Sequence, residues 1–176
     1  MKIQKHILGN REGWDLMSDE YQANSEISLE DVHYSPLSFG EKTANLIGDI
    51  TGKEYVELGC GGAQNSIALA KSGANVTAVD LSSNQLSHAS STCEKLGISV
   101  NLLQANMQSL NYFPDNKFDG ILSVFALEFI EDIDIFFSES NRILKKGGVL
   151  IISTCLLYTS DAADDTPCVD LGGRRI

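Results

Sequence analysis

The chain of 176 residues has few cysteines, and their positions exclude a disulfide framework. Two of the four, Cys155 and Cys168, fall within the last segment, residues 155–176. The other two, Cys60 and Cys93, stand alone in the sequence, and no Cys/His spacing is typical of a metal site. We therefore predict a protein of the reducing cytoplasm with no bound metal.

Basic residues and long apolar runs are also scarce. Lysine and arginine together number 13, against 24 aspartates and glutamates, and the formal net charge is -11. Because phosphate binding draws on clustered basic residues, nucleic acid is a poor substrate for this chain. No apolar run approaches the length that crosses a bilayer, and the start, MKIQKHILGN, lacks the apolar segment of a signal peptide. A hydrophobic content of 43% is enough for one buried core.

The richest pattern that is present lies between residues 55 and 80, which have the features of a nucleotide-binding βαβ unit. A short apolar strand at 55–58 is followed by three glycines in four residues, Gly59, Gly61 and Gly62. Glycine allows a positive φ and a close approach of a ligand to the main chain, and the next helix begins with unpaired N–H groups. A second strand ends at Asp80, about twenty residues beyond the glycines, where an acidic residue reaches ribose hydroxyls.

Glu57 separates two classes of nucleotide. A dinucleotide site places a pyrophosphate on the helix N-terminus and requires GxGxxG, whereas this chain has Gln64 at the last position. The carboxylate of Glu57 would also repel a phosphate. A cationic ligand without phosphate suits this acidic turn better, and S-adenosylmethionine (SAM), with its ammonium and sulfonium groups, is such a ligand.

From Tyr55 to about Thr154 the chain resembles the class I SAM-dependent methyltransferases. The first motif of that family, E/DxGxGxG, is matched by Glu57, Gly59 and Gly61, with Ala63 in place of the third glycine. The resemblance implies an α/β fold. We expect a Rossmann-like, mostly parallel sheet with helices on both faces, in three α/β/α layers.

Later segments follow the family order. Residues 82–85 form a predicted capping box that opens a helix to about residue 96, and residues 100–104 form a third strand. The family holds the adenine at the end of this strand, where Asn106 can accept a hydrogen bond in place of the usual Asp and the Met107 amide can serve the ring.

A fourth strand is expected at 118–124, with 125–129 at the catalytic edge. Helical spacing follows from 133 to 144, then a basic last turn with a glycine cap at 145–148, and a fifth strand at 149–153.

The resemblance implies a set of cofactor-binding residues and two candidate bases. His33 and Glu128 are the best-placed bases for a hydroxyl or carbon acceptor, whereas an amine acceptor needs none once deprotonated. The implied cofactor-binding residues are Tyr34, Glu57, Gly59, Cys60, Gly61, Asn65, Asp80, Leu81, Asn106, Met107, Ser123 and Phe125.

Several of these residues have a structural alternative. On composition alone, His33 and Tyr34 fit surface turn positions, whereas the resemblance places their segment beside the methionine end of the cofactor. Cys60 reads as a small turn residue next to the ligand rather than a nucleophile. Trp14 and Tyr21 are either packing aromatics or part of a lid over the cofactor.

Three regions are predicted. Residues 1–45 form an N-terminal helical cap or lid, and residues 46–154 form an incomplete SAM-binding core. Residues 155–176 resemble no protein family, and two pieces of them look like conceptual translation of sequencing-adapter DNA. We expect a non-native tail after a truncated core that lacks the late strands of the family sheet; a genuine flexible acidic tail is the alternative.

The predicted function is SAM-dependent methyl transfer to a small-molecule acceptor by in-line displacement. Two alternatives stay open from the residues alone. A non-catalytic SAM-binding module would keep Glu57, Asp80 and Asn106 but lack an acceptor pocket. An NAD-dependent oxidoreductase shares the βαβ unit, and Glu57 and Gln64 argue against it.

Overall fold

A parallel sheet in the order β3-β2-β1-β4-β5 forms the centre of the computed structural model, which describes residues 2–35 and 39–154, with side chains from residue 6 onward. Every neighbouring pair of these five strands is parallel. The expected tail at 155–176 lies outside the described residues. The elements are α1 (Lys2–Asn24), α2 (Glu41–Ala44), β1 (Glu54–Leu58), α3 (Gln64–Lys71), β2 (Asn75–Asp80), α4 (Ser83–Leu96), β3 (Asn101–Gln104), β4 (Phe118–Val124), the 3-10 helix η1 (Leu127–Phe129), α5 (Ile133–Ile143) and β5 (Leu144–Ser153).

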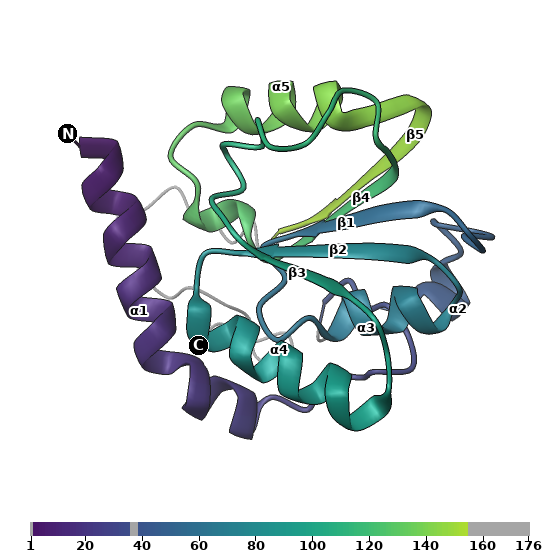
Figure 1. The fold of residues 1–176 in the computed structure, drawn as a ribbon, viewed down its shortest axis with the longest axis horizontal. Coiled ribbons are helices and arrows are strands. Elements are labelled where there is room, and N and C mark those ends of the chain that lie inside the picture. The colour runs from purple at the N-terminus through teal and green to yellow at the C-terminus, as the bar shows by residue number, and fades with distance from the viewer. Residues whose placement is uncertain (1, 36–38, 155–176) are drawn as a thin grey trace.

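The helices cover both faces of the sheet, as Figure 1 shows. Helices α3 and α4 lie on one face and α5 on the other, which confirms the predicted three-layer Rossmann-like fold. Helix α1 lies outside these layers, across the end of the sheet at which the strands terminate (Figure 1). Among the helices in the described ranges, none has the length and apolar character needed to span a membrane.

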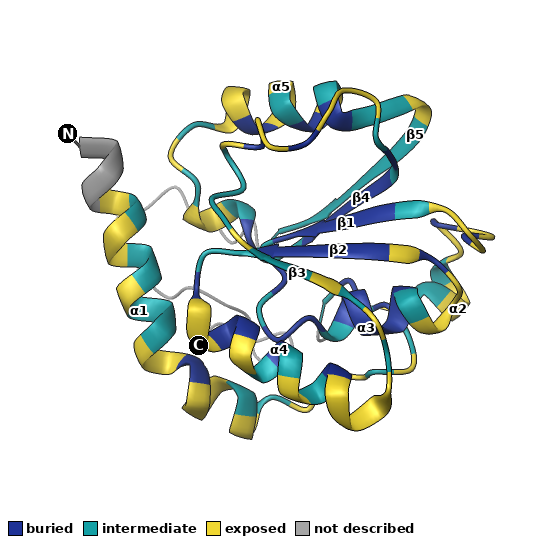
Figure 2. Cartoon of the chain, viewed as in Figure 1, coloured by how far each residue is buried: buried dark blue, intermediate teal, exposed yellow. Residues whose placement is uncertain are grey.

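Alternation along β1 divides the core between the two faces. Val56 and Leu58 are fully buried in the cluster that contains Phe136 of α5. Tyr55 belongs to the opposite cluster, together with Leu69 of α3. Successive strand residues point to opposite faces, so a strand that is buried on both faces must be apolar at nearly every position. Figure 2 shows this burial along β1, β2 and β4.

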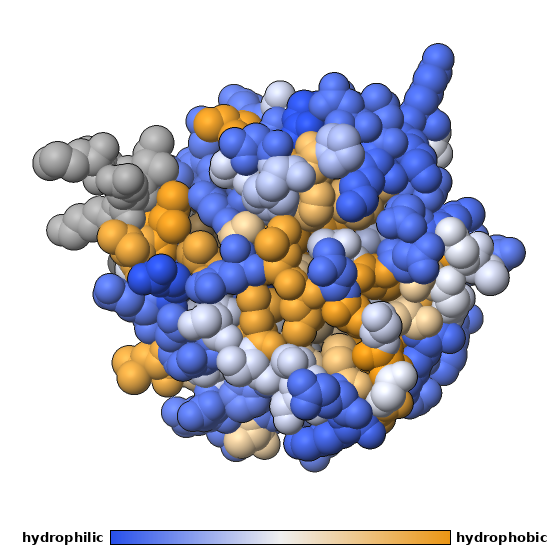
Figure 3. Space-filling model, in the orientation of Figure 1, coloured by the Kyte–Doolittle hydropathy of each residue, from blue (hydrophilic) through white to orange (hydrophobic). Residues whose placement is uncertain are grey.

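The sheet edge at β3 is less covered. Leu102 and Leu103 are only partly buried, and the segment that leads from β3 to β4 contains no regular helix within residues 105–117. Figure 3 shows apolar surface gathered over this part of the molecule, between α4 and α5.

Arg142 of α5 anchors the β3–β4 connection. Its guanidinium donates to the carbonyl oxygens of Leu110 at 2.8 Å and Phe113 at 2.9 Å. It also pairs with Asp115 at 2.8 Å and Glu139 at 2.8 Å. These contacts fix an irregular segment whose first residues line the cavity described below.

The start of α4 confirms the Ser82 half of the predicted capping box but not the reciprocal half, because the Ser82 N–H donates to Asp80 and the Gln85 side chain accepts from Gln22. The Ser82 Oγ accepts a hydrogen bond from the Gln85 N–H at 3.1 Å, and the helix ends at Leu96 before Gly97 in the left-handed conformation. This arrangement satisfies one of the free N–H groups of the first turn.

The predicted boundary between the last helix and the fifth strand was wrong. Helix α5 ends at Ile143, and Lys145–Gly148, expected as a basic last turn and glycine cap, belongs to β5. Leu144 pairs with Phe118 at the beginning of β4. The Lys145 ammonium donates to the Asp119 carboxylate at 2.7 Å, so tertiary pairing overrides the local helix-ending signal.

Gly120 of β4 has no room for a side chain. A Cβ there would lie 2.1 Å from the Tyr55 ring, which is itself buried in the core. We expect Gly120→Ala to lower the free energy of unfolding by about 2–3 kcal/mol through overpacking. Gly13→Ala is the control, because its Cβ would meet nothing within 4 Å and alanine favours a helix. Chemical denaturation measures the free energy of unfolding of both variants. Equal values for Gly120→Ala and Gly13→Ala would contradict the close contact between Gly120 and Tyr55.

Candidate functional site

A cavity opens where the strands end and α1 crosses them. It contains about 1040 Å³ of space not filled by atoms, part of it open to solvent. Its walls come from α1, from the loops after β1, β2, β3 and β4, and from the segment around His33. The ends of parallel strands are the usual binding edge of open α/β sheets.

The glycine-rich loop forms the floor of this cavity. Gly59 and Gly61 have φ values of +77° and +52°, and Ala63, which replaces the third glycine of the motif, is also left-handed at +60°. A Cβ on Gly59 would lie 2.3 Å from the Ala126 Cβ, so the loops after β1 and β4 are in close contact there. At Gly61 the nearest atom would be 3.8 Å away, which leaves the main chain open to a ligand.

Glu57 lies at the inner wall with its side chain buried. One carboxylate oxygen accepts hydrogen bonds from the Ser66 N–H at 2.9 Å and the Ser66 hydroxyl at 2.5 Å. Burial raises the pKa of Glu57 to about 7 despite these bonds, and the nearby Asp80 carboxylate adds to the increase. The ionised form is therefore held at a cost that a cationic ligand would offset.

Asp80 stands at the end of β2 and ties two loops together. One carboxylate oxygen accepts from the Gly61 N–H at 2.7 Å and the other from the Ser82 N–H at 2.8 Å. Burial raises the pKa of Asp80 as well. Among the described residues that line the cavity there is no lysine or arginine, so Glu57 and Asp80 give it an acidic character.

The loop after β3 is joined to the loop before α5. Asn106 Oδ1 accepts from the Gln108 N–H at 3.0 Å. The Gln108 side chain donates to the Asp132 carbonyl and accepts from the Glu131 N–H, each at 3.1 Å. A carbonyl oxygen has two lone pairs, so Asn106 keeps one acceptor position for a ligand.

His33 is positioned by the helix that follows the glycine loop. The main-chain N–H of His33 donates to Asn65 Oδ1 at 2.9 Å, and the Asn65 side-chain amide donates back to the main-chain carbonyl of His33 at 3.2 Å. The side chain of His33 lines the cavity, and burial lowers its pKa. His33 is therefore a neutral imidazole at pH 7, able to accept a proton.

Tyr34 belongs to a separate polar cluster. Its hydroxyl donates to Glu41, which also accepts the N–H groups of Leu46 at 3.0 Å, Ile47 at 2.8 Å and Gly48 at 3.1 Å. Burial raises the pKa of Tyr34 above its ordinary value. This cluster organises the entry to β1 rather than the cavity wall.

The structure brings most of the predicted site residues together. Tyr34, Ser123 and Glu128 do not line the cavity: the Ser123 hydroxyl is buried and donates to the Leu58 carbonyl at 2.9 Å, and Glu128 is exposed and accepts from Thr154. The predicted residues that do line it are His33, Glu57, Gly59, Cys60, Gly61, Asn65, Asp80, Leu81, Asn106, Met107 and Phe125.

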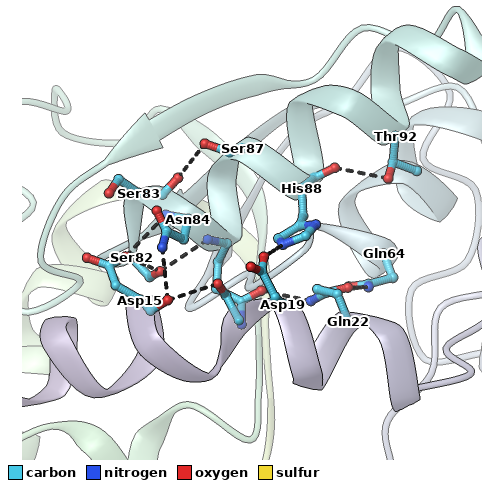
Figure 4. Close-up of polar contacts among 12 residues, drawn as sticks. Asp15, Asp19, Gln22, Gln64, Ser82, Ser83, Asn84, Ser87, His88 and Thr92 are labelled. Carbon is cyan, nitrogen blue, oxygen red and sulfur yellow. Dashed lines mark hydrogen bonds and ion pairs between the residues drawn. The ribbon is translucent and has the colours of Figure 1, made fainter.

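Helix α1 docks on α4 through polar side chains, which Figure 4 shows pointing from α1 toward α4. Asp15 accepts from the Ser82 hydroxyl at 2.6 Å and from the Asn84 N–H at 3.1 Å. Asp19 pairs with His88 at 2.8 Å. Asp15 thus acts as a second cap for α4, supplied by another helix.

Gln22 extends this docking to the glycine loop. Its amide donates to Gln85 at 2.7 Å. It also accepts from the Gln64 amide at 2.6 Å, a contact that Figure 4 shows. A Cβ on Gly62 would lie 2.7 Å from the Gln22 side chain, so Gln22 covers that glycine directly. The sequence indicates a lid only through its aromatic residues, and this polar contact has no local signal.

The described residues contain no group of three or more His, Cys, Asp or Glu side chains placed to hold a metal ion. The two described cysteines, Cys60 and Cys93, are free thiols. Burial raises the pKa of each thiol, which keeps both in the unreactive protonated form.

Comparison with known proteins places this geometry in a family. A family model described as a methyltransferase domain matches residues 56–152, a stretch that spans the motifs from β1 to β5. This chain belongs to the methyltransferase domain family. The match confirms the predicted family, and it supports SAM as the cofactor.

Two bacterial relatives are methyltransferases of named activity. The demethylmenaquinone methyltransferase of Tropheryma whipplei is 29% identical over 151 residues, which are 84% of this chain and 59% of the relative. The ubiquinone biosynthesis O-methyltransferase of Rickettsia felis is 32% identical over 114 residues, 65% of this chain and 46% of the relative. This chain thus spans about half the length of these relatives.

A solved structure agrees with the fold. The S-adenosylmethionine dependent methyltransferase of Mesorhizobium loti is 28% identical with a TM-score of 0.57, over 63% of this chain and 50% of that one.

Proposed function

We propose that this protein transfers a methyl group from SAM to a small-molecule acceptor. The observation that carries the proposal is the acidic cavity at the strand ends, where Glu57 and Asp80 face a ligand space that no described lysine or arginine shares. SAM has an ammonium and a sulfonium and no phosphate, so it fits this charge, whereas a dinucleotide brings a pyrophosphate. The match to the methyltransferase domain family supports the same conclusion.

The residues present have the chemistry to hold SAM. Asp80 would accept from the ribose hydroxyls, since a carboxylate has about four acceptor positions and the main-chain N–H groups of Gly61, Leu81 and Ser82 do not occupy all of them. Asn106 and the Met107 main chain would hold the adenine, and Glu57 would face the cationic methionine end. When bound, SAM supplies an electrophilic methyl group on sulfur.

The protein has to hold the acceptor in line with that methyl group and keep water out. Near-attack geometry supplies much of the rate in such a displacement. Helix α1 closes the cavity through its contacts with α4 and η1, among them the Asn10 amide donating to the Phe129 carbonyl at 2.8 Å. His33 would take the proton of a hydroxyl acceptor.

We expect His33→Ala to lower turnover of a phenolic acceptor at least a hundredfold while SAM affinity stays within threefold of the wild type. Burial lowers the pKa of His33 below its ordinary 6.5, so it is the base form at neutral pH, and wild-type turnover should fall only on acidification below pH 6.5. Acceptor-dependent release of S-adenosylhomocysteine measures this. His6→Ala is the control, because exposed His6 lies outside the cavity wall.

The same assay separates the remaining alternatives. A non-catalytic SAM-binding module would bind SAM yet release no S-adenosylhomocysteine with any phenolic or amine acceptor. That result would overturn the proposed transfer. The cytoplasmic location and the division into a cap at 1–45, a core at 46–154 and a tail stay predictions.

A further inference from the structure

An aromatic cluster lies along one wall of the cavity. The Trp14 ring meets Tyr21 of the same helix at a centroid distance of 5.5 Å and Phe129 of η1 at 5.3 Å, both edge to face. All three rings line the cavity. Tyr21 and Phe129 each remain 40% exposed, so the cluster presents apolar ring surface to the cavity and solvent.

Sheet topology separates Phe129 from the residues assigned to the cofactor, whereas Trp14 and Tyr21 come from α1, which crosses the sheet end. Asp80 ends β2 and Asn106 follows β3, on one side of β1 in the strand order, whereas Phe129 follows β4 on the other side. Ile7 and Ile130 add aliphatic surface to this wall, and Asn10, whose amide donates to the Phe129 carbonyl, lies beside them. One cavity thus has an acidic, hydrogen-bonding part and an apolar, aromatic part.

The negative charge of the cavity further restricts the class of acceptor that it can bind. An anionic acceptor would enter a space that contains two carboxylates and no described basic side chain, and burial would make that repulsion stronger. A flat apolar ring would instead cover the exposed aromatic surface of the cluster and pack in the stacked or edge-to-face geometry that such rings favour. A hydroxyl on that ring would share the cavity with the neutral imidazole of His33.

We propose that the acceptor is an uncharged, ring-bearing apolar molecule that binds against Trp14, Tyr21 and Phe129, with Trp14 as the central specificity residue. This inference rests on the proposed methyl transfer and adds the chemical class of the acceptor. Trp14, which is half-buried, is central because it contacts both other rings, and aromatic anchors commonly carry a large share of binding energy. Acceptors that carry a phosphate are excluded by the same arrangement.

The test uses two probes that share the naphthyl ring, 1-naphthol and 1-naphthyl phosphate, of which the second carries a negatively charged phosphoryl group in place of the hydroxyl hydrogen. Each is titrated calorimetrically into the full protein loaded with S-adenosylhomocysteine, for the wild type, Trp14→Ala, Trp14→Phe and Leu16→Ala. Leu16 is the matched control, because it lies on the same helix and is 86% exposed. S-adenosylhomocysteine binding by every variant verifies folding.

We expect wild-type protein to bind naphthol at least tenfold more tightly than its phosphate ester. Trp14→Ala should weaken naphthol binding at least tenfold, Trp14→Phe should restore most of it, and Leu16→Ala should leave it unchanged. Equal or tighter binding of the phosphate ester, or an unchanged naphthol affinity in Trp14→Ala, would overturn the inference alone. Failure of wild-type protein to bind S-adenosylhomocysteine would overturn the proposed function and this inference with it.

Discussion

Glu57→Gln is expected to raise the melting temperature of the ligand-free protein at pH 8 and to weaken SAM binding at least tenfold. The gain in stability comes from removing a buried negative charge while an oxygen remains to accept from the Ser66 N–H and hydroxyl. The loss in affinity comes from the same charge, which would face the cationic end of SAM. The same substitution is thus expected to raise the stability of the ligand-free protein and to lower its affinity for SAM.

The pH dependence gives this prediction its sign. Burial raises the pKa of Glu57 from 4.5 to about 7, so between these values the folded state keeps a proton that the unfolded state has lost. The free energy of unfolding therefore falls as the pH rises through this window, by about 3 kcal/mol. In Glu57→Gln that decline should be absent.

Thermal melts of the ligand-free protein from pH 4.5 to 8 measure the effect, with Glu54→Gln as the control. Glu54 is on the same strand, lies outside the cavity wall and accepts from the Asn75 amide at 2.9 Å. Parallel melting curves for wild type and Glu57→Gln across this pH range would show that Glu57 carries no buried charge.

Asp80→Ala should weaken SAM binding by one to two orders of magnitude. Charge-assisted hydrogen bonds to the ribose contribute about 1.5–3 kcal/mol each, and about 1.4 kcal/mol corresponds to a tenfold change in affinity. The substitution also frees the Gly61 N–H and the Ser82 N–H, so the glycine loop loses a tie to β2.

Asp80→Asn keeps the shape of the side chain and one of the two main-chain hydrogen bonds, whereas Asp80→Ala loses both. The Asn variant removes the charge, and its amide nitrogen cannot accept from the Gly61 or Ser82 N–H. We expect it to lose at least tenfold in affinity by calorimetric titration. Asp134→Asn, an exposed position in the first turn of α5, should bind like the wild type. An unchanged dissociation constant in folded Asp80→Ala would mean that Asp80 does not contact the cofactor.

The parts of the fold that can be predicted from the sequence are those with strong local signals. The glycines after β1, the acidic end of β2 and the Ser82 cap of α4 each need a particular residue type at a fixed position, so the sequence shows them directly. The carboxyl ends of parallel strands lie at the same edge of the sheet. The sequence alone is therefore enough to predict that Glu57 and Asp80 lie near each other.

The parts that the sequence does not show depend on contacts between distant segments. Asp15 caps α4 and Gln22 covers Gly62 because α1 lies across the sheet end. A polar residue on a helix gives no signal in the sequence of whether it contacts solvent or another element. The β5 boundary differs from the prediction because Leu144 pairs with β4. The family resemblance assigned Tyr34 to the cofactor site, whereas its hydroxyl donates to Glu41 and the residue does not line the cavity.

Direct titration of the protein with SAM, with S-adenosylhomocysteine and with NAD at pH 8 tests the central claim, that the acidic cavity is a SAM site. We predict saturable binding of the first two ligands and none of NAD, because Glu57 and Asp80 favour a cation and the loop lacks the glycine spacing for a pyrophosphate. Saturable binding of NAD without binding of SAM would contradict the account.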